Sequence, residues 1–181
     1  MKPTGPTPAL LFWSVLYHVD FVSRETLIHD FERFSGPVLV YSHPYYPMAK
    51  YYSSEMGAQE KLKRLFFVSL RPTPRESLLS AKQKALVWEQ AWEDQGSRRI
   101  NIDPGLLSLE NVVLSTAKPY SHRIYLADGI YGELCLLFKQ GKYTPLDWSY
   151  PDYSHEQVID FFHFLRSFLK GRIKSEKSCL L

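Results

Sequence analysis

The chain has 181 residues, of which 45% are hydrophobic and 23% are charged, and this composition suits one globular domain spanning residues 1–181. The 22 basic and 19 acidic residues leave a net charge of +3, which is too small to indicate nucleic acid as a main partner. With only two cysteines, Cys135 and Cys179, the sequence argues against a disulfide framework or a cysteine-based zinc site. No apolar run reaches the roughly 18 to 20 residues of a membrane span, so we expect a cytoplasmic protein without a membrane partner.

Strand and helix patterns alternate in the first half of the chain. Residues 10–17 form an apolar strand pattern, and Ser23 is a suitable N-cap for a helix whose apolar positions follow a 3.6-residue period up to Gly36. A short strand is predicted at 38–41. The stretch SHPYYPMAKYYSSEMG at 42–57 combines prolines and tyrosines without a clear period, and it predicts a long loop of the kind that often carries function.

The middle of the chain gives four further elements. A strand is predicted at 63–70, followed by a helix that Thr73 caps and that extends to about residue 94. The outer face of this helix is rich in Lys and Glu, which is typical of a solvated surface. A strand at 98–102 is then expected to end at a Pro-Gly turn, and a short helix to follow at 108–116.

A hairpin and a final helix complete the predicted order. The hairpin covers 118–134, and SHEQ at 154–157 is a capping pattern for a helix with apolar residues on one face. The basic segment 170–181 is expected to fray. This order predicts an α+β fold in which helices pack on a mostly antiparallel sheet, with a ferredoxin-like first half and a C-terminal hairpin and helix.

The hairpin has two possible turns. If residues 128–129 alone form the turn, Ile124 lies opposite Glu133, and polar and apolar groups mix on both faces. If the loop covers 127–129, Arg123 lies opposite Glu133 and the two faces separate cleanly. Because a one-residue slip exchanges the faces of a strand, we favour the second register.

The favoured register collects polar side chains on one face of the hairpin. One interpretation is an exposed cross-strand ion pair beside two tyrosines, which contributes about 0.2 to 1 kcal/mol per pair. The other is a binding surface on which Glu133 positions Arg123 or acts as a base. His122 is the second candidate for catalysis, but it falls on the opposite, apolar face, where a histidine is more often a core residue than a catalytic group. The residues of the polar face are Ser121, Arg123, Tyr125, Tyr131 and Glu133.

No known motif names a reaction. Asp103 stands before Pro-Gly in NIDPG at 101–105, where its carboxylate can hold a metal or cap the amides of the turn, and capping is the more frequent role. The sequence contains no P-loop, no GxGxxG and no HExxH, CxxC or GxSxG motif. Whether the protein is an enzyme therefore stays open.

Four motifs in order give the chain a family resemblance. The pieces YYSSEMG at 51–57, NIDPGLL at 101–107, KPYSHRIYLADGIYGEL at 118–134 and SYPDY at 149–153 resemble the bacterial family of domain of unknown function 4416, some members of which carry the label GTP-binding protein. The resemblance spans nearly the whole chain. It implies a cytosolic single-domain protein with a polar site built from these motifs, but no particular activity.

The residue types in these motifs suit a phosphate or metal–phosphate site. Lys118 and Arg123 can hold an anion, and carboxylates can hold Mg²⁺, which makes this ion the candidate cofactor. The carboxylates are Glu55, Asp103, Glu133 and Asp152.

Two functions are compatible with the sequence. In the first, the protein binds a phosphorylated or otherwise anionic small ligand, such as a nucleotide, on the polar face of the hairpin beneath the 42–57 loop. In the second, it is a non-enzymatic module whose aromatic loop binds a protein or an RNA strand. Convergence of Glu55, Asp103, Arg123 and Glu133 in one pocket favours the first function, and an exposed flat patch of tyrosines favours the second. The sequence does not indicate an oligomeric state.

Overall fold

The computed structural model describes residues 2, 4–42, 49–94 and 96–178. Its strands are β1 (Leu10–His18), β2 (Val38–Ser42), β3 (Leu62–Ser69), β4 (Ile100–Leu107), β5 (Asn111–Thr116), β6 (Arg123–Ala127), β7 (Ile130–Lys139) and β8 (Lys142–Pro145). Its helices are α1 (Arg24–Ser35), α2 (Ala49–Met56), α3 (Ser77–Ala91) and α4 (Glu156–Ser178), with a 3₁₀ turn at Gln59–Lys61. This content confirms the predicted α+β class.

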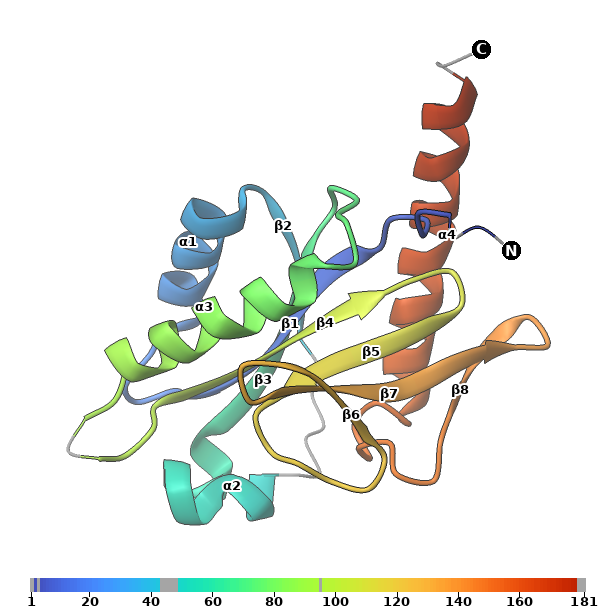
Figure 1. Cartoon of the computed structure of the whole chain (residues 1–181). Helices are drawn as coiled ribbons and strands as arrows, with labels where there is room; N and C mark the ends of the chain where they lie inside the picture. The colour runs from blue at the N-terminus through green and yellow to red at the C-terminus, as the bar shows by residue number, and fades with distance from the viewer. Residues whose placement is uncertain (1, 3, 43–48, 95, 179–181) are drawn as a thin grey trace.

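All of these strands belong to one antiparallel sheet (Figure 1). The strand order is β2-β3-β1-β4-β5-β7-β6, and β8 pairs with β7. Strands β1 to β4, with α1 and α3 as crossover helices, have the βαββαβ order and the strand arrangement of a ferredoxin-like unit. The remaining strands extend the same sheet, so the predicted ferredoxin-like first half and the C-terminal hairpin and helix are both present.

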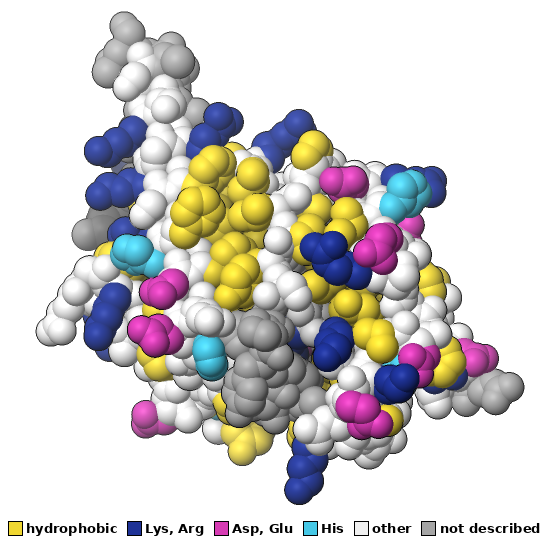
Figure 2. Space-filling model, turned by 180° about the vertical axis from the view of Figure 1, so that it is seen from behind, with side chains coloured by type: hydrophobic (Ala, Val, Ile, Leu, Met, Phe, Trp, Pro, Cys, Tyr) yellow, Lys and Arg dark blue, Asp and Glu magenta, His cyan; other side chains and the backbone are white. Residues whose placement is uncertain are grey.

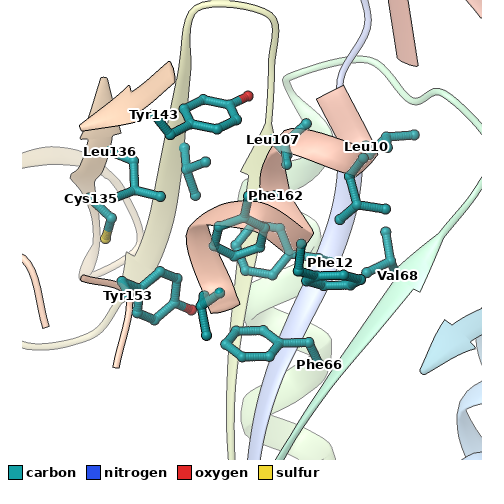
Figure 3. Close-up of a cluster of buried hydrophobic side chains, with 14 of the residues drawn as sticks. Leu10, Phe12, Phe66, Val68, Leu107, Cys135, Leu136, Tyr143, Tyr153 and Phe162 are labelled. Carbon is teal, nitrogen blue, oxygen red and sulfur yellow. The ribbon is translucent and has the colours of Figure 1, made fainter. Parts of the chain in front are cut away.

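Helices cover both faces of the sheet. On one face α1 and α3 pack against β1 and β3, and the ring of Phe31 stacks 4.1 Å from that of Phe67. On the other face α4 places the ring of Phe162 at 5.3 Å from Phe12 and 5.7 Å from Phe66 (Figure 3). All five phenylalanines are fully buried, and each such side chain contributes about 1.5 to 3 kcal/mol to stability.

Strand β4 is longer than the sequence predicts, because it continues through residues 103–105 without a turn. The side-chain hydroxyl of Ser115 donates to the carbonyl oxygen of Pro104 at 2.9 Å, so this edge of β4 faces β5. Strand β5 does not pair with β4 at this position, and the missing N–H of proline therefore costs no ladder bond. The predicted turn, and with it the turn-capping role of Asp103, is wrong.

The segment 108–116 is also different from the prediction, because it forms a tight turn and then β5 instead of a helix. Gly105 in β4 pairs with Leu114 in β5. A Cβ on Gly105 would lie 2.3 Å from the ring of Phe12 and 2.8 Å from the carbonyl oxygen of Val113, so glycine is what permits this close approach. The pairing of the two strands overrides the local helix signal.

The stretch 42–57 is only partly described, because residues 43–48 lie outside the described ranges. Its second part is not the predicted loop but the helix α2. Met56 at the end of α2 is buried against Leu16 and Leu62, and this apolar contact anchors the helix beside the sheet.

The helix starts agree with the prediction at one site and differ at another. Ser23 caps α1 as predicted, since its hydroxyl oxygen accepts the N–H of Thr26 at 3.0 Å. Thr73 does not cap α3, which begins at Ser77. The backbone of Thr73 is instead bonded in both directions to Ala9, just before β1.

Helix α4 projects beyond the sheet (Figure 1), and its segment 170–178, predicted to fray, is helical. Lys and Arg side chains gather on this projecting end (Figure 2), among them the exposed Lys170, Arg172 and Lys174. Within the described ranges, no helix is long and apolar enough to cross a membrane. Cys179 lies outside these ranges.

The hairpin of β6 and β7 has the favoured register but a shorter turn. Arg123 lies opposite Glu133, which confirms the prediction. The turn consists of residues 128–129 alone, with φ angles of 51° and 74°. Leu126 has no partner on β7, and this bulge supplies the one-residue shift that reconciles the short turn with the favoured register.

Candidate functional site

The candidate site lies where β4 and β5 separate. The two strands pair only over 105–107 and 112–114. Nearer the start of β4, two side chains of α3 take the place of β5: Glu89 Oε1 accepts the N–H of Ile102 at 2.6 Å, and Lys82 Nζ donates to the carbonyl oxygen of Ile102 at 2.8 Å. The edge of β4 that faces away from β1 therefore stays hydrogen-bonded although β5 does not pair with it there.

The separation leaves a cleft of about 380 Å³, which falls within the usual size range of small-molecule sites. Its walls come from α2, α3, β4, the segment 116–123 and Tyr150. The charged side chains in these walls are four cations and two carboxylates: Lys82, Arg98, Lys118, Arg123, Glu89 and Asp103.

Four tyrosines also line the cleft: Tyr51, Tyr52, Tyr120 and Tyr150. The rings of Tyr51 and Tyr52 meet edge to face at 5.0 Å, and Lys118 Nζ lies 5.9 Å from the centre of the Tyr51 ring. Tyrosine rings next to cations suit a ligand that carries both a planar ring and a negative charge.

Asp103 points its carboxylate at two groups of the cleft wall. It accepts hydrogen bonds from Lys82 Nζ at 3.1 Å and from Asn101 Nδ2 at 2.7 Å. Burial raises the pKa of Asp103, but the charge of Lys82 and these hydrogen bonds outweigh burial, so the pKa lies below its ordinary value. Asp103 is therefore ionised at neutral pH and balances the charge of Lys82.

Glu89 lies between two cations of the cleft. Its side chain is buried, with Oε1 at 3.9 Å from Lys82 Nζ and Oε2 at 3.9 Å from Arg98 Nη1. Burial raises the pKa of Glu89 to about 6, although the charge of Lys82 acts in the opposite direction. A carboxyl group with this pKa can exchange a proton near neutral pH.

Arg98 connects α2 to the start of β4. Its Nη1 donates to Asn101 Oδ1 at 3.0 Å, and its Nη2 forms an ion pair with Glu55 of α2. Glu55 itself does not line the cleft.

Arg123 holds two walls of the cleft together. Its Nε donates to Glu133 Oε2 at 2.6 Å, its Nη1 donates to the carbonyl oxygen of Lys118 at 2.8 Å, and its Nη2 donates to the hydroxyl of Tyr150 at 2.9 Å. The Glu133 side chain is only 1% exposed and that of Arg123 only 11%. The pair is therefore buried, and the interpretation as an exposed surface ion pair is wrong.

His122 lies next to this pair but does not line the cleft. Its Nε2 is 3.5 Å from Glu133 Oε2, and its ring stacks on Trp148 with the ring centres 5.1 Å apart. This geometry indicates that His122 packs between Trp148 and Glu133. Neither His122 nor Glu133 lines the cleft, so neither has direct access to a molecule bound there.

A small void lies below the cleft and shares Tyr52, Asp103 and Tyr150 with it. The void measures about 10 Å³. The hydroxyl groups of Ser14 and Tyr153 border it, and both side chains are buried. These two hydroxyls make the floor of the cleft polar.

The three candidate metal ligands do not come together. Glu55 pairs with Arg98, Asp103 with Lys82, and Asp152 with Arg64 in a buried ion pair. Among the described residues, no group of three or more His, Cys, Asp or Glu side chains is arranged to hold a metal ion.

The remaining residues of the predicted polar face lie outside the cleft. Tyr125 and Tyr131 contact each other edge to face at 5.4 Å, and Tyr125 is 59% exposed on the edge strand. Ser121 is exposed in the turn before β6. Of the predicted set, only Lys118, Arg123 and Asp103 line the cleft.

Sequence reasoning did not select Lys82 and Glu89, because it interpreted the Lys and Glu residues of this helix as a solvated outer face. Both side chains are buried, at 4% and 6% exposure. They are seven residues apart and thus lie on the same side of α3. A Lys and a Glu at this spacing, on the side that also carries the buried Ala81 and Ala85, are the signal that could have identified them.

Comparison with known proteins identifies the family and no relative of known activity. No curated protein and no solved structure matches the chain. The family model described as Domain of unknown function (DUF4416) matches residues 7–168, which include β1 to β8, all walls of the cleft and most of α4. The chain therefore belongs to the DUF4416 family.

Proposed function

We propose that this protein binds a small anionic ligand, with a phosphate-like or sulfate-like group and a planar ring, in the cleft between α2, α3, β4 and the segment 116–123. A cytoplasmic location is part of this proposal. The earlier expectation of a site on the open face of the hairpin changes accordingly, because the hairpin contributes a wall of the cleft through Arg123.

The observation that carries the proposal is that Lys118 lines the cleft without a carboxylate partner among the described residues. The other cleft cations have carboxylate partners, since Lys82 pairs with Asp103, Arg98 with Glu55 and Arg123 with Glu133. Lys118 is exposed in the lining, and among the described residues it has no carboxylate partner. An ammonium group at this position can bind an anion without first breaking an ion pair.

The tyrosines support the second part of the proposal. Lys118 Nζ lies 5.9 Å from the centre of the Tyr51 ring. A ligand whose ring stacks on Tyr51 therefore places an attached anionic group near this ammonium group. Base–aromatic stacking of this kind contributes about 1 to 3 kcal/mol per base in other proteins. A nucleotide or an aryl phosphate satisfies both requirements.

The alternative function, an interaction module that uses the 42–57 stretch, has less support. Tyr51 and Tyr52 line the cleft together with charged residues. Tyr45 and Tyr46 lie outside the described ranges. The described tyrosines of this stretch therefore favour a small ligand over a flat surface for a protein or RNA strand.

A thermal-shift series tests the proposal. Nucleoside monophosphates, sugar phosphates and aryl phosphates are added with and without Mg²⁺, since a metal ion at this site has to arrive with the phosphate. We expect at least one ring-bearing anion to raise the melting temperature, because a molecule that binds only the folded state stabilises it. The rise should be larger than for the corresponding uncharged ring.

A charge reversal identifies the site. Lys118→Glu should abolish the rise, whereas Lys139→Glu, an exposed lysine at the end of β7, should retain it. An equal rise in both variants contradicts the proposal, and so does the absence of a rise with every anion in the series.

A further inference from the structure

The position of Glu89 has a consequence for how an anion enters the cleft. Its carboxylate lies 3.9 Å from Lys82 Nζ and 3.9 Å from Arg98 Nη1, and both cations line the cleft. Ionised Glu89 is thus a counter-ion built into the wall. An anion placed in the cleft approaches the same two cations and is repelled by this carboxylate.

We infer that the cleft takes up its anion together with a proton, and that Glu89 is the residue that binds this proton. The inference rests on the proposed function, since it describes how the same cleft accommodates the charge of its ligand. Protonation of Glu89 removes the negative charge next to Lys82 and Arg98, which keep their ion pairs with Asp103 and Glu55, and the wall becomes more positive toward the anion. The bond from the Ile102 N–H can persist, because a protonated carboxyl group retains a carbonyl oxygen that accepts it.

The surroundings of Glu89 explain why the proton binds there and not on a neighbour. Burial raises the pKa of Glu89 to about 6, whereas the pKa of Asp103 is lowered, because Lys82 and Asn101 hydrogen-bond to the Asp103 carboxylate. The charged or titratable groups that face Glu89 or its partners come from α3, β4, the segment before β4, and α2: Lys82, Asp103, Arg98, Glu55 and Tyr52. Of the two carboxyl groups that line the cleft, Glu89 is therefore the one that changes its charge more easily near neutral pH.

Thermodynamic linkage makes the inference measurable. If the bound anion raises the affinity of Glu89 for a proton, the proton raises the affinity for the anion by the same factor. Affinity for the anion should therefore increase as the pH falls through about 6. We expect the increase to be on the order of threefold to tenfold between about pH 8 and about pH 5.

The probe for this experiment is para-nitrophenyl sulfate, which carries a ring and a sulfate monoester that does not titrate in the range used. Its binding to the full chain is measured by isothermal titration calorimetry at several pH values. Each titration is repeated in two buffers of different ionisation enthalpy, because the difference in heat gives the number of protons taken up. The wild type should take up a fraction of one proton per bound sulfate ester near pH 6.

Two substitutions assign the proton. Glu89→Gln mimics the protonated side chain, so it should bind the probe with little pH dependence and without proton uptake. Glu32→Gln makes the same charge change on the exposed surface of α1 and should behave as the wild type.

The outcomes separate this inference from the proposed function. If the probe binds the wild type without proton uptake, or if Glu89→Gln retains the uptake, the role of Glu89 is refuted while the anion site remains. If para-nitrophenyl sulfate and the aryl phosphates of the thermal-shift series all fail to bind both the wild type and Glu89→Gln, the anion site itself is refuted.

Discussion

Strand β1 pairs with β4 along its whole length, but the other edge of β4 has different neighbours in its two halves. Its second half pairs with β5 over 105–107, where Gly105 lets the strands approach closely and Phe12 packs over the contact. Its first half does not pair with β5, and Lys82 and Glu89 of α3 form hydrogen bonds to the backbone of Ile102 instead. One half is closed and apolar, and the other is open, polar and lined by charges.

This difference shows how one strand can serve both the core and the site. Where the strands pair, backbone hydrogen bonds are satisfied by the ladder and side chains are free to be apolar. Where they separate, the exposed backbone edge needs polar side chains, and these same side chains then line the opening. The site is thus a product of incomplete strand pairing, and predictions that target each half can test this comparison.

The largest effect is expected for Arg123, which holds the walls of the open half. Arg123→Ala leaves Glu133 buried at 1% exposure without its cation, so it should lower the free energy of unfolding by about 3 to 5 kcal/mol. Urea denaturation measures this loss. Lys118→Ala, which truncates an exposed cation of the same cleft, should change stability by only about 0.5 kcal/mol or less. A mild effect of Arg123→Ala would mean that the open half is not held by this pair.

A smaller effect is expected in the closed half. Gly105→Ala places a Cβ at 2.3 Å from the Phe12 ring and 2.8 Å from a backbone oxygen, so it should cost about 1 to 3 kcal/mol. Gly132→Ala in β7 is the matched control, because its Cβ would meet Leu126 at 3.6 Å and Val113 at 3.7 Å, which are ordinary contacts. Denaturation curves in which both variants are equally stable would show that β4 and β5 do not approach as closely as described.

The smallest effect is expected for the pH dependence of stability that Glu89 causes. Its pKa is raised from 4.5 to about 6 in the folded protein, so the folded state binds more protons than the unfolded state between these values. The wild type should therefore lose stability relative to Glu89→Gln as the pH rises through this window, by on the order of 1 to 2 kcal/mol. Thermal denaturation of both proteins from about pH 4 to about pH 7 measures the difference. A stability difference between the two proteins that stays constant with pH would show that the Glu89 carboxyl group is solvated and not buried.

Much of the fold follows from local patterns, because alternation and capping act over a few residues. The register of Arg123 and Glu133 is predictable, since only one register separates polar from apolar side chains. The segment 108–116 is not, because its strand conformation depends on pairing with β4, which is a tertiary contact.

The candidate site is predictable to a lesser degree. Lys118, Arg123 and Asp103 lie in conspicuous polar motifs and do line the cleft. The spacing of Lys82 and Glu89 on the apolar side of α3 indicates that both are buried, but it does not indicate a cleft, because their role depends on β5 leaving the edge of β4 uncovered. Local patterns carry no information on such a gap between strands.

The proposed role of the cleft is tested most directly by an NMR titration of the backbone amides with para-nitrophenyl phosphate. The protein has a second basic region, the projecting end of α4 with Lys170, Arg172 and Lys174 (Figure 2), which serves as an internal control for nonspecific anion binding. We predict saturable shifts concentrated at residues 98–103 and 116–123, with small changes along 170–178. Shifts that follow the basic end of α4 and leave the cleft unchanged would contradict the proposal.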